Sequence, residues 1–123
     1  MTRTDKKVGD SLKGKVPPDL AASGVEAALK VIEGRWKMLI LFQLFAKGTM
    51  RFSALERGIP AVSQKMLIQQ LRELERDGVI ARQVYPEVPP RVEYSLTALG
   101  DALCPALDAL LQWTQMRDEA STA

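Results

Sequence analysis

The spacing of apolar residues predicts helices in the first third of the chain. Four apolar residues follow the i, i+3, i+4, i+7 pattern and predict an amphipathic helix that ends near Gly34: Val25, Ala28, Leu29 and Ile32. The next run, WKMLILFQLFA at 36–46, is apolar nearly all round. It is too short to span a membrane, so we expect it to form a buried central helix.

Shorter elements follow this central helix. A turn at 47–49 precedes a short strand predicted at 50–52. Ser53 is the candidate cap of a brief helix that ends at Arg57, and the Gly-Ile-Pro sequence at 58–60 then interrupts the chain. The pattern therefore predicts a short helix followed by a tight connection.

A longer helix is predicted over residues 63–77. Ser63 is a good N-cap, although Met66 at the third helical position excludes the reciprocal capping box. Gly78 can take the left-handed conformation that ends a helix. Three leucines within a narrow sector of the helical wheel predict its buried face: Leu67, Leu71 and Leu74.

Two strands and a stiff loop come next. The segments 79–85 and 91–96 both have strand character, and in the second strand apolar and polar residues alternate as they do when one face is buried. The proline-rich link at 86–90 cannot belong to the hydrogen-bonded ladder, so we expect it at the hairpin tip. Thr97 is the predicted cap of a last long helix with a leucine-rich stripe.

This order of elements predicts a winged helix-turn-helix. The fold is mainly α (α+β), with a wing hairpin of two to three strands between a helix pair and a C-terminal helix. Such folds commonly insert the second helix of the pair into the major groove of DNA. Residues 1–20 are polar and charged, so we expect a flexible basic arm before a single domain over 21–123.

Charge and composition narrow the class of protein. The formal charge is +2, and residues 1–20 carry five basic and three acidic side chains, which accounts for all of it. The chain has no histidine and one cysteine, so His-based catalysis, an internal disulfide and the usual zinc sites are excluded. We therefore expect a cytoplasmic protein that is not an enzyme and uses no metal or cofactor. The sequence offers neither a membrane span nor the apolar core of a signal peptide.

The helix over 63–77 has a basic, amide-bearing face opposite its leucines. Lys65, Gln69, Arg72 and Arg76 lie there, and Ile68 lies beside them. Arg, Lys and Gln side chains can bond base edges or phosphates, and an apolar side chain can contact a thymine methyl. The same residues also describe any solvated helix face. The helix becomes a candidate DNA recognition helix (reading head) mainly because of the order of the elements around it.

Three segments carry a resemblance to a known family: VEAALKVIEGRWKMLIL, MRFSALERGIPAVSQKMLIQQLRELERDGVI and VYPEVPPRVEYSLTALG. Over about 25–113 the chain resembles the HxlR-type family of bacterial winged-helix transcriptional regulators. The resemblance implies a homodimer that binds double-stranded DNA at a roughly palindromic operator, with helix 63–77 and the wing at 85–92 as contacts. It implies DNA contacts at these positions: Ser63, Gln64, Lys65, Ile68, Gln69, Arg72 and Arg91.

The family also implies that the first and last helices form the dimer interface. Their apolar residues are the expected contacts: Val25, Leu29, Ile32, Leu99, Leu103, Leu107 and Leu110. Two departures matter. Many members carry a cysteine just before the VEA segment, whereas this chain has Ser23 there and its one thiol at Cys104. Ile68 stands where a small polar residue such as Thr is common.

Two other classes stay open at this point. A protein-interaction winged helix would use its apolar helices to recruit a partner, and it predicts a neutral or acidic face on helix 63–77. A small-molecule-binding module, or an unknown effector of a DNA-binding protein, would need a pocket. Trp36, Trp113 and Met116 are candidates to line one, although aromatic residues at helical spacing are more often plain core.

Overall fold

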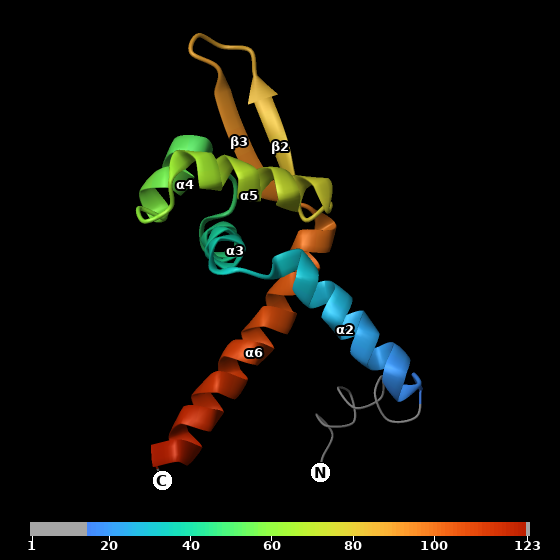
Figure 1. Ribbon diagram of the computed structural model, residues 1–123. Coiled ribbons are helices and arrows are strands. Elements are labelled where there is room, and N and C mark those ends of the chain that lie inside the picture. The colour runs from blue at the N-terminus through green and yellow to red at the C-terminus, as the bar shows by residue number, and fades with distance from the viewer. Residues whose placement is uncertain (1–14, 123) are drawn as a thin grey trace. The chain divides into compact units, whose positions relative to one another are not determined.

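The computed structural model describes residues 15–122, and Figure 1 shows the path of the chain. The elements in chain order are α2 (Pro18–Ile32), α3 (Arg35–Lys47), β1 (Met50–Arg51), α4 (Phe52–Gly58), α5 (Gln64–Arg76), β2 (Ile80–Tyr85), β3 (Arg91–Leu96) and α6 (Ala98–Thr122). The order helix pair, hairpin, helix confirms the predicted winged helix-turn-helix.

The described chain divides into two compact units. The first contains α2 and ends at Glu33, and the second runs from Gly34 onward. The helix α2 begins at Pro18, seven residues before the expected start at Val25, because a proline fits the first turn, where no backbone N–H is needed. The end of the predicted arm is therefore already helical, and residues 1–14 of that arm lie outside the described residues.

The core of the second unit lies between α3, α4, α5 and the sheet. It contains Ile40, Leu41 and Leu44 of α3, Leu55 of α4, the three predicted leucines of α5, and Val79, Ile80 and Tyr94 of the hairpin. The prediction for α3 needs a correction, because this helix is not buried all round. Leu39 and Phe42 are each 39% exposed, so α3 buries one side only.

The ends of α5 follow the sequence closely. Ser63 is the N-cap, and its Oγ accepts a hydrogen bond from the Met66 backbone N–H at 3.1 Å. At the other end Gly78 has a φ of 78°, and the N–H of Val79 donates to the carbonyl of Leu74 at 3.0 Å. This left-handed end satisfies carbonyls of the last turn and directs the chain into β2.

The wing is an antiparallel sheet in the order β1-β3-β2. Ile80 pairs with Leu96 at its base and Tyr85 with Arg91 at its outer end. Met50 pairs with Tyr94, so the expected short strand joins the sheet. Residues 86–90 connect the hairpin outside the ladder, as their prolines predict, and the hairpin projects from the second unit (Figure 1).

The start of α6 is fixed against the base of the hairpin. Thr97 accepts a hydrogen bond from the Gly100 backbone N–H at 3.1 Å, which confirms the predicted cap. A Cβ at Gly100 would lie 2.1 Å from the Val79 carbonyl oxygen, so only glycine permits this close approach. The predicted cap of α4 is wrong, since Arg51 rather than Ser53 precedes this helix and no side chain caps it.

Candidate nucleic-acid interface

The exposed face of α5 gathers most of the residues that the sequence singled out. Ser63, Gln64, Lys65, Gln69 and Arg72 are exposed, and Ile68 is half-buried. All of these except Ser63 line one shallow depression, together with Glu73. Because Leu67, Leu71 and Leu74 hold the opposite side in the core, this face is presented on a rigid helix.

A buried lysine holds one edge of this face. The ammonium of Lys37, on α3, lies 2.6 Å from a Glu73 carboxylate oxygen, and the Lys37 side chain is only 8% exposed. Gln69 donates a hydrogen bond to the other Glu73 oxygen at 3.3 Å. The hydrogen bond from Lys37 keeps the pKa of the Glu73 carboxyl below its usual range, and that from Gln69 adds to this effect. Nothing in the periodicity of the sequence indicates that Lys37 is the partner of Glu73.

Arg91, which begins β3, has partners within the hairpin. Its guanidinium lies 3.1 Å from a Glu87 carboxylate oxygen and 3.6 Å from one of Glu93, and it stacks 3.9 Å from the centre of the Tyr85 ring. Two carboxylates thus neutralise the one cation, and together they carry more charge than it does. Arg91 thus connects the hairpin loop to both strands, and its contact with DNA stays a prediction.

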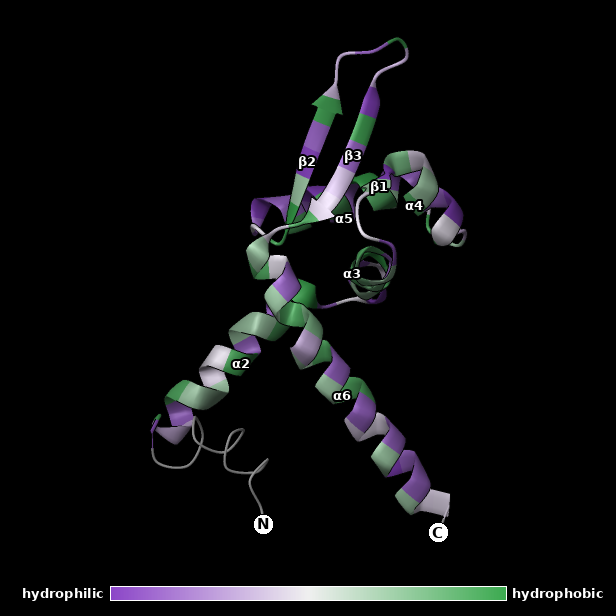
Figure 2. Cartoon of the chain, turned by 180° about the vertical axis from the view of Figure 1, so that it is seen from behind, coloured by the Kyte–Doolittle hydropathy of each residue, from purple (hydrophilic) through white to green (hydrophobic). Residues whose placement is uncertain are grey.

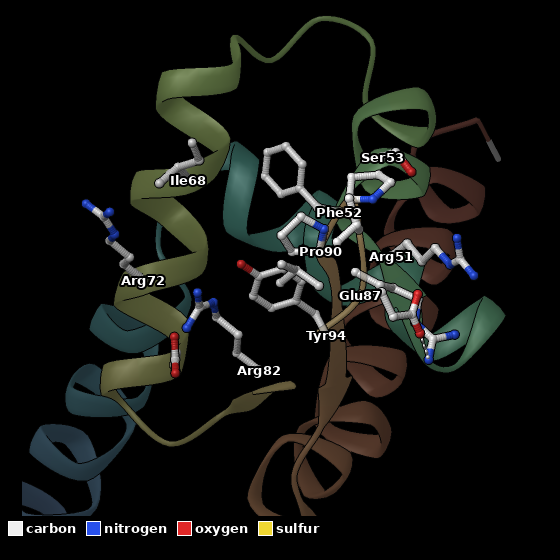
Figure 3. A pocket seen from close by; sticks show the side chains of 14 residues that line it. Arg51, Phe52, Ser53, Ile68, Arg72, Arg82, Glu87, Pro90 and Tyr94 are labelled. Carbon is white, nitrogen blue, oxygen red and sulfur yellow. Dashed lines mark ion pairs between the residues drawn. The ribbon is translucent and has the colours of Figure 1, made fainter. Parts of the chain in front are cut away.

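A groove of about 760 Å³ separates the wing from α5 (Figure 3). Arg51, Arg72 and Arg82 line it, and Tyr94 contributes to its wall. Figure 3 shows Arg82 and the Tyr94 hydroxyl directed toward α5, whereas Arg51 extends away from it. Among residues 15–122 none of these three arginines has a carboxylate within ion-pair distance.

Arg82 is the residue of this groove that the sequence analysis missed. It is exposed on β2, where it pairs with Tyr94 of β3. Strand alternation alone could have placed Arg82 on the same face of the hairpin as Tyr94. Without the tertiary structure, however, nothing indicated that this face looks toward α5.

The residues expected at a dimer interface fall into two groups. Ile32 and Leu107 are 3% and 4% exposed in the single chain, so they do not offer apolar surface to a partner. Val25, Leu29, Leu99 and Leu110 are exposed, and Leu103 is half-buried. Beyond Leu107, α6 also exposes apolar side chains that the sequence analysis did not assign to the interface: Leu111, Trp113 and Met116.

Other kinds of site find little support in the described chain. Cys104 is a half-buried free thiol beside a small cavity of about 300 Å³ that is also lined by Leu44 and Asp101. No group of three or more potential metal ligands occurs within residues 15–122. In the same part of the chain, no helix is both long and apolar enough to cross a membrane.

Fold and surface together define the class. A helix pair presents an amide-bearing and basic second helix, and a wing follows beside it. This is the arrangement of a DNA-binding transcriptional regulator of the winged helix-turn-helix type.

Comparison with known proteins identifies the family. The HxlR-like helix-turn-helix family matches residues 31–122, and the chain belongs to this family. The chain is 53% identical over 92 residues to an uncharacterized HTH-type transcriptional regulator of Methanothermobacter thermautotrophicus, a match that covers 75% of this chain and 70% of the relative. It is 52% identical over 90 residues to YkvN of Bacillus subtilis, another uncharacterized HTH-type regulator, covering 73% and 75% of the two chains.

Solved structures of similar proteins have the same fold. A putative MarR-family transcriptional regulator from Enterococcus faecalis V583 superposes with a TM-score of 0.77 at 38% identity, over 82% of this chain and 91% of that one. The redox regulator HypR in its reduced form superposes with a TM-score of 0.72 at 42% identity. The match covers 81% of this chain and 99% of HypR.

Proposed function

We propose that the protein acts as a homodimer that binds a roughly palindromic operator in the cytoplasm. Each copy inserts the outward face of α5 into a major groove and places the wing beside it. The observation that carries this proposal is the outward face of α5, which is exposed, basic and rich in hydrogen-bonding groups. The helix that presents this face is capped by Ser63 and held in the core by its leucines.

The residues of this face have distinct roles in the proposal. Gln69 and Arg72 lie one turn apart and reach base edges, where Arg can bond guanine and Gln can bond adenine. Ser63, Gln64 and Lys65, at the start of α5, bond phosphates or the first bases. Ile68, half-buried between the depression and the groove, contacts a thymine methyl.

The dimer is proposed to form through apolar side chains of the two terminal helices. Within α6, Leu110, Trp113 and Met116 recur every three residues and are 52%, 57% and 64% exposed. In α2, Val25 and Leu29 lie one turn apart and are also exposed. Exposed apolar surface of this kind on each of the two helices marks an interaction site, and a second copy of the chain supplies a matching surface.

The alternative classes are less well supported. A winged helix that only recruits proteins predicts a neutral or acidic face on α5, whereas Lys65 and Arg72 are exposed there without an ion-pair partner in residues 15–122. An unknown small-molecule effector stays part of the proposal, but no side chain of the described residues identifies its chemistry.

Selection of bound duplexes from a random pool tests whether the operator has two-fold symmetry. We expect an inverted repeat whose half-sites lie about one helical turn apart, roughly 10 base pairs, because two-fold symmetry of the dimer imposes it. An enriched site without two-fold symmetry would contradict the proposed dimeric binding.

Arg72→Ala tests the reading head. Loss of a bidentate base contact costs about 1–3 kcal/mol, so the variant should lose roughly 5- to 150-fold in affinity for the selected duplex and much less for random DNA. Arg117→Ala is a matched control, because it removes the same charge from α6, where Arg117 already pairs with Asp118. An unchanged ratio between the two affinities of Arg72→Ala would remove α5 as the reading element.

A further inference from the structure

The groove between α5 and the wing has a charge pattern that the reading face does not explain. Arg51, Arg72 and Arg82 line it without ion-pair partners among residues 15–122, whereas Arg91 is neutralised by Glu87 and Glu93. Glu75 is the one carboxylate of the lining that is left unpaired in that range. Positive charge therefore exceeds negative charge along the groove, and a site of this kind favours an anion.

Only one of the three unpaired arginines is directed across the groove. Arg72 points outward from α5 and Arg51 extends away from this helix, whereas Arg82 reaches from β2 toward α5 beside the hydroxyl of Tyr94 (Figure 3). Tyr94 is 7% exposed, and its backbone pairs with Met50 of β1 and Arg82 of β2. Arg82 thus supplies a guanidinium with several N–H donors, and Tyr94 supplies a hydroxyl donor beside it.

We propose that Arg82 and the Tyr94 hydroxyl form a binding site for one phosphate of the DNA backbone, in the groove between α5 and the wing. This inference rests on the proposed insertion of α5 into the major groove. When a helix occupies the major groove and a wing lies beside the duplex, the backbone between the grooves passes between the two elements. The guanidinium can bond two phosphate oxygens, and the hydroxyl can donate to one of them.

The hydroxyl remains a donor under physiological conditions. Burial raises the pKa of the Tyr94 phenol, and the nearby Arg82 guanidinium opposes this effect only in part. The phenol therefore stays protonated when an anion enters the groove. The proposed site also gives the wing a contact with DNA that does not depend on Arg91, whose charge is neutralised by Glu87 and Glu93.

The test measures binding to a random-sequence duplex over a range of salt concentrations, which needs no knowledge of the operator. Each phosphate contact adds about 0.9 to the slope of log affinity against log salt. Arg82→Gln should lower that slope by about one for each subunit that engages DNA. Arg82→Lys, which keeps the charge, should retain most of it.

One variant serves as a control of equal charge change. Arg117→Gln should leave the slope unchanged, because Arg117 lies on α6 and already pairs with Asp118. Tyr94→Phe should weaken binding to random and selected duplexes in equal proportion without changing the slope, because it removes a neutral donor. Thermal melting of each variant confirms that it is folded.

The outcomes separate this site from the reading function. A wild-type slope in folded Arg82→Gln would overturn the phosphate site while leaving α5 as reading head. A change in the ratio of selected to random affinity, with the slope retained, would also overturn it, because Arg82 would then contact bases. A wild-type protein that binds random and selected duplexes equally would instead contradict the proposed sequence reading.

Discussion

At the scale of single residues, one ion pair connects the core to α5, the proposed reading helix. Lys37 is a buried cation on α3, and Glu73 on α5 is its partner at 2.6 Å. A buried ammonium without a carboxylate would be costly, and a carboxylate left unpaired beside DNA would repel phosphates. The pair therefore positions α5 and removes a negative charge from its reading face, while Glu73 also orients Gln69.

We predict that Lys37→Met lowers both thermal stability and DNA affinity. The variant leaves Glu73 without its strongest partner, so the carboxylate faces the DNA uncompensated and Gln69 loses a fixed orientation. The double variant Lys37→Met with Glu73→Gln should recover much of the affinity, because it removes the uncompensated charge. Equal loss in the single and double variants would contradict this role.

The same pair predicts a pH dependence of stability. The pKa of the Glu73 carboxyl is lower in the folded protein than its ordinary value of 4.5. The ionised Glu73 carboxylate therefore contributes fully to the free energy of unfolding above about pH 4.5. This contribution is lost as pH falls through the lowered pKa of the folded protein. Denaturant unfolding of wild type and Lys37→Met should give a stability difference that narrows below pH 4.5. A constant difference down to pH 3 would refute the assignment.

At the scale of elements, the approach of α6 to the base of the wing requires glycine, which has no side chain, at position 100. Gly100 lies in the first turn of α6, where a Cβ would meet the Val79 carbonyl oxygen at 2.1 Å. Thr97 caps the same turn and donates to the carbonyl of Gly78 at 2.6 Å. The end of α5, the start of β2 and the start of α6 thus meet at one point, and α6 holds the wing relative to the reading helix.

Gly100→Ala should destabilise the protein despite the higher helix propensity of alanine. Overpacking of this kind typically costs about 1–3 kcal/mol, against a propensity gain of at most about 1 kcal/mol. Gly24→Ala in α2 is the matched control. It has nothing within 4 Å of the added Cβ and should stabilise by roughly 0.5–1 kcal/mol. Denaturant unfolding measures both, and an unchanged or raised stability of Gly100→Ala would show that α6 does not need this contact.

At the scale of the whole molecule, much of α6 has no partner within its own unit. Leu107 is buried, but beyond it the helix extends from the rest of the second unit with apolar residues exposed along it (Figure 2). A chain of this size gains stability from burying such a surface, at about 25 cal/mol for each Å² removed from water. A symmetric dimer would do this and would also present two reading helices to one duplex.

Sedimentation should therefore show a dimer at tens of micromolar, and Leu110→Asp should shift it toward the monomer by placing a charge in the apolar contact. The monomer should bind the selected duplex with strongly reduced affinity, because one half-site then binds alone. Val84→Asp is the control for the sedimentation measurement only, since Val84 is an exposed apolar residue of the wing and not of α6. A wild-type monomer, or a dimer that survives Leu110→Asp, would contradict the assigned contact.

The sequence by itself determined the order of elements, because each depends on local chemistry. Ser63 and Thr97 cap helices with their own hydroxyls, Gly78 supplies a left-handed end, and the prolines at 86–90 cannot join a ladder. The leucine spacing of α5 likewise fixed which side it buries and hence which side it presents. These features need no knowledge of distant neighbours.

Only the tertiary structure decided which charges are available to a ligand. Lys37 and Glu73 are 36 positions apart in the sequence, and no periodicity indicates that they pair. The sequence alone does not show that Arg91 pairs with Glu87 and Glu93, or that Arg82 lines a groove beside α5. Whether a cation is neutralised depends on distances of a few ångströms between separate elements, since electrostatic attraction decreases with separation and with exposure to water. Those distances are set by packing.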